Sequence, residues 1–594
     1  MRKLSRCLSL AALALGLAAA TLTPARAAAD LKVLTVPRTG QFDTLDPPQQ
    51  FNDITDQLMR QVYSSLLTYA YLERPYKLAP DLLAQMPELA ADKVTYTFRL
   101  RQGIRFHDNP CFKDGKGREV VADDVLYSLK RFADARLNSK SWFAMEGAVL
   151  GLDDFRAATA KAAPGTDATG LDVAGLHKID KHTFTIKLTR ENPLFLYALA
   201  MSPTAVVPIE AVQFYKERFG VNPVGTGPFT LKDIDRKGTL HLMKNPNYHG
   251  IYPSVGAPGD AALGLLKDAG KKLPLVDLVE MPLIEEAQPA ALKFLKGEID
   301  LRGLDRANFT KIVERTGDGG FRLKDEFAPK FNIYWVPAIS LTYQGINMKD
   351  PLLGGNKKLR QALAHLMDTR GLIDTLQNGR GRKLQSIVPF ELAGGEQDTG
   401  ASFHEYDLAK AKQLLTEAGY PAAKGLPPIT VSYHLSDAET RDHFDFAKAR
   451  FAAGGVQLKA AFMDTPAFSK ATEGGNFQIY DYGWVADFPD AENFYQLLYS
   501  KNVAPGPNLP TFSNPVYDRA YEASRHMASG PQRNEHFKTM NALIKDEVPI
   551  IIGVNPLRFG ILQKWVSNHK RNLLVPGAEF AFVDVDMVRK KKGL

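Results

Sequence analysis

Cysteine is almost absent from this 594-residue chain, which contains only Cys7 and Cys111. Cys7 lies in an N-terminal segment that we expect to be removed, so the mature chain has no second thiol with which to form a disulfide. Stability must therefore come from a large hydrophobic core rather than from covalent cross-links. A single core rarely grows beyond about 250–300 residues, so the length predicts two or more lobes.

Long hydrophobic runs are also missing, with one exception at the N-terminus. Three basic residues lie within the first six, residues 8–22 are mostly apolar, and an Ala-Arg-Ala stretch ends at Ala27. This order is typical of a secretory signal peptide, residues 1–27, with cleavage after Ala27 or alternatively after Ala29. No later stretch approaches the ~18 apolar residues that span a bilayer, so we expect a soluble, exported protein.

A strong excess of charge of one sign is lacking. Removal of residues 1–27 takes away four basic residues and no acidic one, so the formal net charge falls from +8 to +4. This mild excess gives no support for a nucleic-acid partner. The basic run at residues 589–592 is expected to be a solvated tail.

Local signatures of catalysis are absent as well. The chain has no Gly-x-Ser-x-Gly elbow, no His-Glu-x-x-His, no Cys-x-x-Cys and no phosphate-binding Gly-x-x-x-x-Gly-Lys-Ser/Thr loop. We therefore expect no enzyme activity, no metal and no cofactor. The glycines of Gly225-Thr226-Gly227 are interpreted as turn residues that supply positive φ before a strand.

Hydrophobic periodicity indicates an α/β chain. Residues 95–100 and 183–188 alternate apolar and polar side chains, as half-buried strands do. Helices are predicted at residues 122–132, 356–379 and 532–547, and after Asp407, where a helix should stop at Gly419. Residues 151–174 and 250–274 have the composition of linkers or exposed insertions.

The most informative segment is residues 480–494. It places the carboxylate of Asp487 among aromatic and small apolar residues, at the predicted end of a short strand. No basic residue lies between Phe477 and Tyr499, although an unpaired buried charge is costly. The partner of Asp487 must come from a distant segment or from a ligand, unless Asp487 only caps a turn at Pro489.

Several segments, taken in order, resemble the family 5 extracellular solute-binding proteins, the dipeptide- and oligopeptide-binding receptors of ABC importers. The segments that carry this resemblance lie at residues 96–108, 122–131, 224–229, 244–248, 297–300, 359–364, 406–420 and 484–487. Each is weak alone, and their common order over residues 40–560 makes the resemblance specific.

The resemblance implies a two-lobed α/β periplasmic-binding-protein fold of the cluster C type, with an accessory third domain and a hinge. By analogy, lobe I takes residues 28–70, 190–335 and 556–594, and the accessory domain takes residues 71–189. Lobe II then takes residues 336–555, with crossings between the lobes near residues 334–346 and 550–555. Strand-like crossings suit a hinge that bends while it stays hydrogen-bonded.

The resemblance also implies a site. In peptide receptors of this kind, an aspartate at the position of Asp487 pairs with the α-ammonium group of the peptide, which is largely protonated at neutral pH. Trp484 would add an apolar or cation–π wall, and Tyr482 and Asp481 complete the expected ligand-binding set. Oligopeptide-binding relatives carry a basic residue at the position of Asp481, near the far end of the ligand. This departure argues against recognition of a longer peptide's carboxylate by this residue and leaves a cationic or non-peptide ligand as an alternative.

The resulting prediction is a monomeric periplasmic receptor that encloses a short peptide between its lobes and delivers it to an inner-membrane ABC permease. The alternatives within the family are receptors for another amine-bearing or cationic solute, for an opine, haem or a nickel complex, or for an oligosaccharide. A secreted hydrolase and a periplasmic sensor built on the same fold are the alternatives from other classes.

Overall fold

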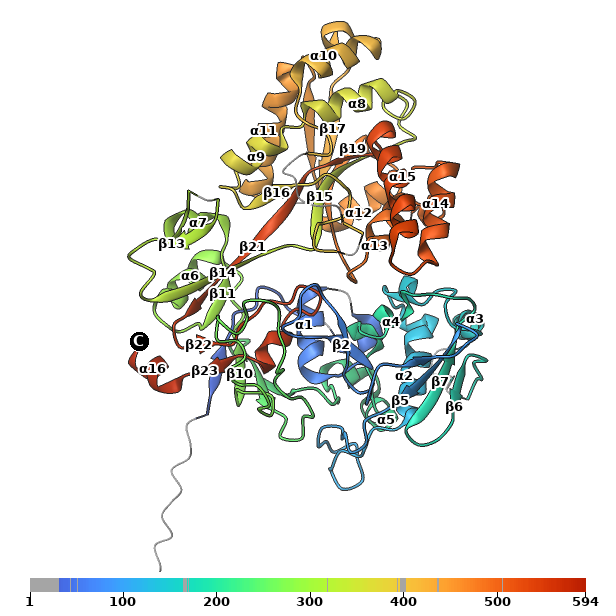
Figure 1. The fold of residues 1–594 in the computed structure, drawn as a ribbon, viewed down its shortest axis with the longest axis vertical. Coiled ribbons are helices and arrows are strands. Elements are labelled where there is room, and N and C mark those ends of the chain that lie inside the picture. The colour runs from blue at the N-terminus through green and yellow to red at the C-terminus, as the bar shows by residue number, and fades with distance from the viewer. Residues whose placement is uncertain are drawn as a thin grey trace, which may run out of the picture.

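The chain folds into two lobes that lie one above the other along the long axis of the molecule (Figure 1). A computed structural model describes residues 31–593, except 43, 51, 164–167, 169, 318, 393, 396–401, 435–436 and 505. The expected signal peptide lies outside the described residues. Within the described ranges, no helix is long and apolar enough to cross a membrane.

The first lobe is built on a four-stranded sheet of order β1-β10-β9-β8, in which β1 runs parallel to β10 and the other pairs are antiparallel. Helix α1 packs beside it, and the short β2–β3 hairpin follows α1. The elements are β1 (Val33–Thr35), α1 (Asp53–Val62), β2 (Leu67–Tyr69), β3 (Leu78–Pro80), β8 (Phe229–Ile234), β9 (Leu240–Lys244) and β10 (Leu278–Met281).

A second antiparallel sheet, of order β4-β5-β7-β6, lies at the outer end of the first lobe, where α2 and α3 pack together (Figure 1). Its core is a stack of Phe98 on Phe184, with ring centroids 5.0 Å apart. The elements are β4 (Glu88–Leu89), β5 (Thr95–Arg99), α2 (Ala122–Ala133), α3 (Leu152–Lys161), β6 (Leu176–Lys178), β7 (Thr183–Lys187), α4 (Phe195–Ala198) and α5 (Ile209–Tyr215).

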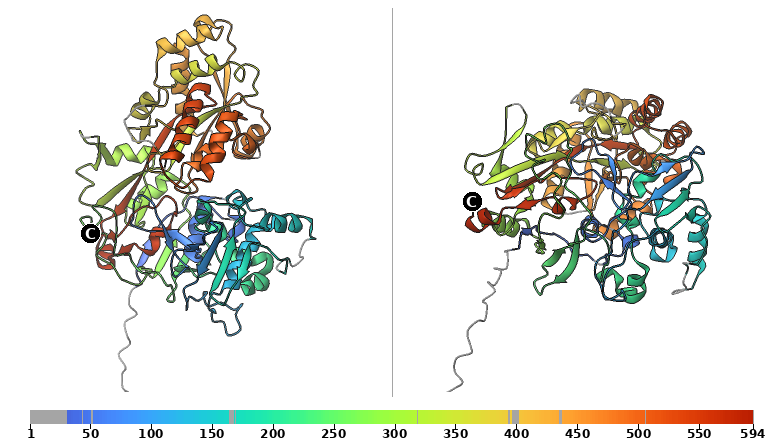
Figure 2. Two further views of the ribbon diagram at one scale, coloured as in Figure 1. Left: turned by 45° about the vertical axis from the view of Figure 1, so that its right-hand side comes forward. Right: turned by 60° about the horizontal axis from the view of Figure 1, so that its bottom comes forward.

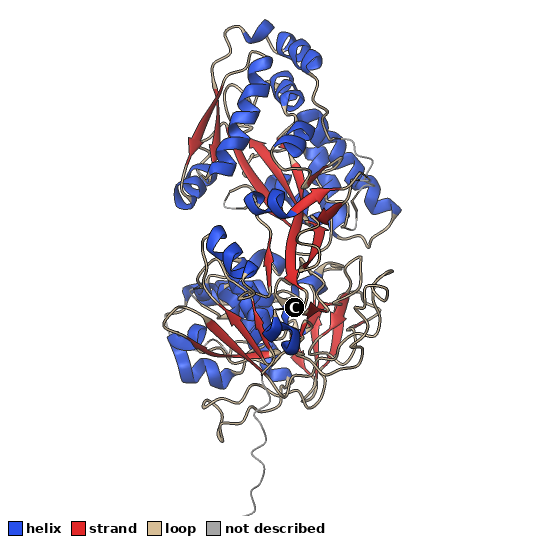
Figure 3. Ribbon diagram, turned by 90° about the vertical axis from the view of Figure 1, so that its left-hand side faces the viewer, coloured by secondary structure: helices blue, strands red, loops and turns tan. Residues whose placement is uncertain are grey.

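The lobes are joined by two strand pairs that cross between them, as the view in Figure 3 shows. Strand β14 leads directly into β15, and β20 leads into β21, which pairs with β11, β14 and β16. Asn555 ties the crossings together, because its Nδ2 donates to the carbonyl oxygens of Ala338 and Ser340 at 2.6 and 2.8 Å. The elements of this region are α6 (Ala287–Leu295), β11 (Leu301–Gly303), α7 (Arg306–Ile312), β12 (Val313–Arg315), β13 (Phe321–Leu323), β14 (Phe331–Pro337), β16 (Gly381–Lys383), β21 (Val554–Gln563), β22 (Val566–Ser567), β23 (Asp584–Val585) and α16 (Met587–Lys592).

The second lobe surrounds a mixed five-stranded sheet of order β18-β17-β19-β15-β20, with helices on both faces (Figures 1 and 2). One face packs on α8, α10 and α11 through buried side chains such as Leu363, Leu415 and Phe451. The strands are β15 (Ser340–Ile346), β17 (Ile429–Tyr433), β18 (Leu458–Phe462), β19 (Ile479–Val485) and β20 (Ile550–Ile552); the helices are α8 (Lys357–Leu366), α9 (Thr369–Thr375), α10 (Leu408–Glu417), α11 (Ala438–Ala453), α12 (Thr465–Glu473), α13 (Glu492–Tyr495), α14 (Pro515–Arg525) and α15 (Pro531–Glu547).

The basic run at residues 589–592 is not the solvated tail that was expected. It belongs to helix α16, and its Lys590 Nζ pairs with Oδ2 of the buried Asp300 at 2.6 Å.

Most predicted elements are confirmed, and three further interpretations are wrong. The helix predicted at 356–379 is two helices, α8 and α9, separated where Asp368 caps the second one by accepting from Gly371 N at 2.8 Å. The linker predicted at 151–174 contains α3, whose Leu152 and Phe155 are buried. Neither Gly225 nor Gly227 has positive φ.

Glycine is required at positions 225 and 227 for a steric reason. A Cβ atom at Gly225 would lie 2.2 Å from the carbonyl oxygen of Val62, and one at Gly227 would lie 2.6 Å from that of Gln61. Close approach to the end of α1, rather than turn geometry, therefore requires glycine at both positions. The proposed limits of the three domains within the chain stay a prediction.

Candidate ligand-binding site between the lobes

Strand β19 sends its side chains alternately to the two faces of the second-lobe sheet. Tyr482 and Trp484 lie on one face, where the Tyr482 ring contacts Phe468 of α12 with centroids 5.7 Å apart. Asp481 lies on the opposite face, opposite Gln344 of β15. The structure therefore brings Tyr482, Trp484 and Asp487 to one side and separates Asp481 from them.

The position of Asp487 is fixed by Asn493, which is fully buried at the start of α13. The Nδ2 of Asn493 donates to Asp487 Oδ2 at 2.9 Å, and its Oδ1 accepts from Trp484 Nε1 at 2.8 Å and from Asp487 N at 3.1 Å. One amide side chain thus holds the carboxylate and the indole in a fixed relation. This is the preorganisation that a binding site needs.

Asp487 forms no ion pair with any described residue. Burial raises the pKa of its carboxyl to about 6, against the lowering effect of the Asn493 hydrogen bond and with a further rise from the charge of Glu492. No backbone amide of the described chain donates to this carboxylate, so the turn-capping alternative has no support in the structure. Asp490 has that role instead, because its Oδ1 accepts from Glu492 N at 2.9 Å.

Aromatic rings from the first lobe close the other side of the site. Tyr197 of α4 stacks on Phe488 with centroids 5.7 Å apart and 6° between the planes, and Tyr69 of β2 stacks on Tyr197 at 6.5 Å. Burial raises the pKa of Tyr69, and the negative charge of Asp487 adds to the rise. Asp487 therefore faces the first lobe across an aromatic contact between the lobes.

A cavity of about 320 Å³ continues from this contact between the outer end of the first lobe and α14 of the second. Two contacts border it: Arg525 pairs with Glu492 at 3.3 Å, and His526 Nδ1 lies 3.2 Å from the carbonyl oxygen of Glu191. The lining residues are Phe143, Ala144, Glu146, Gly147, Ala148, Arg190, Asn192, Leu194, Ala198, Phe488, Glu492, Gln496, Asn502, Tyr521, Arg525 and His526.

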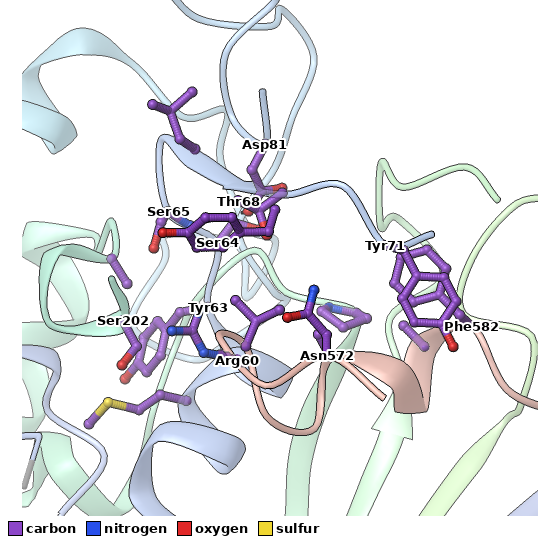
Figure 4. Close-up of a pocket in the computed structure, with 18 of the residues that line it drawn as sticks. Arg60, Tyr63, Ser64, Ser65, Thr68, Tyr71, Asp81, Ser202, Asn572 and Phe582 are labelled. Carbon is purple, nitrogen blue, oxygen red and sulfur yellow. Dashed lines mark hydrogen bonds between the residues drawn. The ribbon is translucent and has the colours of Figure 1, made fainter. Parts of the chain in front are cut away.

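Figure 4 shows a different cavity, of about 90 Å³, whose lining residues come from the first lobe. Its charged side chains have partners in the same lobe, since Arg60 pairs with Asp56 at 2.9 Å and Asp81 contacts His249 at 2.8 Å. Charged side chains that already have partners within the lobe leave little for a charged ligand to satisfy. We therefore place the candidate site at Asp487 and not here.

Asp481 lines a third cavity, inside the second lobe, of about 80 Å³. Burial raises the pKa of its carboxyl to about 7, and the one hydrogen bond that this carboxyl accepts from the described residues, from Gln344 Nε2, is long at 3.4 Å. Within the described residues, no group of three or more His, Cys, Asp or Glu side chains is arranged to hold a metal ion.

Comparison with known proteins shows what kind of protein carries this site. Residues 77–506 match the model of the bacterial extracellular solute-binding proteins, family 5. The chain belongs to this family. It is 24% identical over 503 residues to the dipeptide-binding protein of Escherichia coli (strain K12), which covers 82% of this chain and 83% of that protein. It is 23% identical over 523 residues to heme-binding protein A of Haemophilus influenzae, with 86% and 84% covered.

Solved structures of such proteins have the same fold. The periplasmic binding protein DppA from Helicobacter pylori, solved in complex with the peptide STSA, superposes with a TM-score of 0.70 at 20% identity, covering 93% of this chain and 98% of that one. The murein tripeptide binding protein MppA of Escherichia coli gives 0.70 at 20% identity, with 94% and 99% covered. The predicted two-lobed α/β fold is confirmed.

The structure adds several residues to the candidate site that the sequence did not indicate. Sequence reasoning missed Asn493, Phe488, Tyr69 and Tyr197. The first two lie within six residues of Asp487, and a search for polar or aromatic side chains near that acid would have found them. Tyr69 and Tyr197 carry no local signal, because only the packing of α4 and β2 against the second lobe brings them near.

Proposed function

We propose that this chain is the periplasmic substrate-binding component of an ABC importer, and that it captures a short peptide between its lobes for delivery to an inner-membrane permease. Relatives that bear the names of dipeptide-binding and di/tripeptide-binding proteins cover about four-fifths of the chain. Export by a cleavable signal peptide, a monomeric state, the absence of a catalytic step and the absence of a nucleic-acid partner are parts of the same proposal.

The observation that carries the proposal is the carboxylate of Asp487. It lies beside the aromatic side chains of Trp484 and Tyr69, is fixed by Asn493, and has no cationic partner in the described chain. A free α-ammonium group, with a pKa of about 7.7–8.0, supplies the missing charge and up to three hydrogen-bond donors. Charge-assisted hydrogen bonds of this kind are stronger than neutral ones.

Binding between the lobes explains how the ligand changes the shape of the protein. Asp487 and Phe488 belong to the second lobe, whereas Tyr69 and Tyr197 belong to the first. A peptide that contacts both sides stabilises the closed arrangement, which is a population shift toward closure about the β14–β15 and β20–β21 crossings. Hydrogen bonds to the peptide backbone along strand ends would allow varied side chains.

The test is calorimetric titration of Ala-Ala and of N-acetyl-Ala-Ala into the wild type and Asp487→Asn. Removal of one member of a desolvated charge pair costs about 2–5 kcal/mol, which is a ~30- to several-thousand-fold loss of affinity. We expect this loss for Ala-Ala in the variant, and equally weak binding of the acetylated peptide to the wild type.

The matched control is Asp445→Asn, since Asp445 is exposed on α11 and lies outside the site. It should bind Ala-Ala like the wild type. Binding of Ala-Ala to Asp487→Asn within a factor of two of the wild type would refute the amine-binding role, and hydrolysis of the peptide during the titration would make the protein an enzyme.

A further inference from the structure

The cavity that contains Asp481 lies between the second-lobe sheet and helices α9 and α11. Side chains of β15 and β19 form one wall, and His443 and Phe446 of α11 form another. Its volume of about 80 Å³ is several times the ~10–15 Å³ that one water molecule needs. It is large enough for a small polar group of a ligand.

Two polar side-chain atoms that line this cavity lack a hydrogen-bond partner. Gln377 Oε1 and His443 Nε2 are buried and have no hydrogen-bond partner in the described chain. Asp481 receives only the long bond from Gln344. Buried polar atoms without a hydrogen-bond partner cost free energy, about 1–3 kcal/mol each and more for a charged group, so a ligand group that bonds to them is stabilised there.

No lysine or arginine lines the cavity to neutralise Asp481. Burial lowers the pKa of His443, and the charge of Arg306 on α7 lowers it further against the raising effects of Glu439, Asp442 and Asp437 on its own helix. The imidazole is therefore neutral at pH 7 and adds no positive charge to the cavity. The ring of Tyr433 also lines the cavity, whereas the ring of Phe446 already carries the guanidinium of Arg450, 4.8 Å from its centroid.

We propose that this cavity is the subsite for a cationic side chain of the bound peptide, a guanidinium or ammonium group whose donors satisfy Asp481, Gln377 and His443. The inference rests on the proposed function and adds a preference for basic peptides. A guanidinium group carries five N–H donors and no acceptor, which complements a cavity with unsatisfied acceptors.

The cavity lies within reach of a peptide held at Asp487. Along β19, Asp481 lies about 13 Å from the strand end at Val485, at ~3.3 Å per residue, and Asp487 follows two residues later. Because the two acids lie on opposite faces of the sheet, the peptide has to pass over the strand end to reach the cavity. Thr342 and Gly553, next to the crossings between the lobes, line the cavity, and Arg306 of the first lobe lies near His443. An arginine or lysine at the second or third position of an extended peptide covers this distance.

The test compares Ala-Arg and Ala-Ala-Arg with the same peptides in which neutral citrulline replaces arginine, by titration calorimetry. Citrulline keeps the shape and removes the charge. We expect the wild type to bind at least one arginine peptide at least ~30-fold more tightly than its citrulline analogue. Asp481→Asn should reduce this preference to less than about threefold.

Gln377→Met, which removes one acceptor at nearly constant length, should weaken the preference in part, and Asp445→Asn on α11 should keep it. Equal binding of arginine and citrulline peptides by the wild type, or a preference that survives in Asp481→Asn, would refute the subsite and leave the peptide receptor intact. If neither Ala-Ala nor any of these peptides binds, the proposed function fails and this inference fails with it.

Discussion

Asp487 and Asp490 lie three residues apart after the same strand, and they have opposite surroundings. Both oxygens of Asp490 accept hydrogen bonds from Arg533, at 2.6 and 2.7 Å, and both side chains are almost fully buried. Asp487 is held by the neutral amide of Asn493 and has no cation near it in the described chain. The charge of Asp490 is neutralised by a residue of the protein, and the charge of Asp487 is not.

This difference separates a structural role from a binding role. A buried ion pair whose members both come from the chain fixes the position of α15 relative to α13, and it leaves nothing for a ligand to do. A buried acid that is fixed in place without a cation destabilises the ligand-free protein. Binding of a cationic ligand removes this penalty and stabilises the complex. Four further changes test whether the two aspartates divide their roles in this way.

The largest effect is expected from Arg533→Met, which leaves Asp490 buried without its partner. The free energy of unfolding should fall by about 3–5 kcal/mol, because an uncompensated buried charge is strongly destabilising. Chemical denaturation monitored by circular dichroism measures it. The double variant Asp490→Asn with Arg533→Met removes both charges and should recover a clear part of the loss. A single variant as stable as the wild type would contradict the structural role of the pair.

Asp487→Asn should have the opposite effect on stability. The pKa of Asp487 in the folded protein, about 6, lies above the ordinary carboxyl value near 3.8, so the ionised form is destabilised above pH 6 and the penalty disappears as the pH falls toward 4. The variant should therefore be more stable than the wild type by about 1–3 kcal/mol at pH 7.5, and equally stable near pH 4. Thermal unfolding at both pH values, without ligand, measures this difference. A variant that is less stable at pH 7.5 would show that Asp487 supports the fold.

The contrast between these two acids was only half visible in the sequence. The absence of basic residues between Phe477 and Tyr499 correctly indicated that no local cation exists for Asp487, but it applied equally to Asp490. Arg533, 43 residues away, pairs with one acid and not with the other. Only the packing of α15 against the turn decides between them, and no local pattern encodes that packing.

The fold was more predictable than the site. The alternation in β5 and β7 and the cap of α10 by Asp407, which accepts from Lys410 N at 2.9 Å, were local signals that the structure confirms. The prediction that Asp481 and Tyr482 belong to one binding site rested on their proximity in sequence. Because side chains alternate along a strand, these two neighbours lie on opposite faces of the sheet. The wall formed by Tyr69 and Tyr197 depends on how the lobes meet.

The pH dependence of binding distinguishes the two acids without altering the fold. The α-ammonium group needs ionised Asp487, so affinity for Ala-Ala should be nearly constant between the carboxyl pKa of about 6 and the amine pKa of about 7.7–8.0, and fall about tenfold per pH unit below pH 6. Between pH 7.5 and pH 5 the expected loss is roughly tenfold. Calorimetry over this range measures it, and Asp487→Asn should give a flat profile. A wild-type affinity that is unchanged at pH 5 would contradict pairing of the amine with this carboxylate.

The smallest effect concerns the amide that holds Asp487. Trp484→Phe removes the indole N–H that donates to Asn493 Oδ1 at 2.8 Å and keeps an aromatic ring in place. Asn493 then loses one of its restraints, and Asp487 is held less firmly. A neutral hydrogen bond contributes about 0.5–1.5 kcal/mol, so affinity for Ala-Ala should fall by about two- to tenfold, with no change in its pH profile. Trp142→Phe, in the outer part of the first lobe, is the matched control and should bind normally. If Trp484→Phe binds like the wild type, the Asp487 carboxylate is held by the Asn493 amide without the indole; a shifted pH profile would show instead that Trp484 sets the pKa of Asp487 directly.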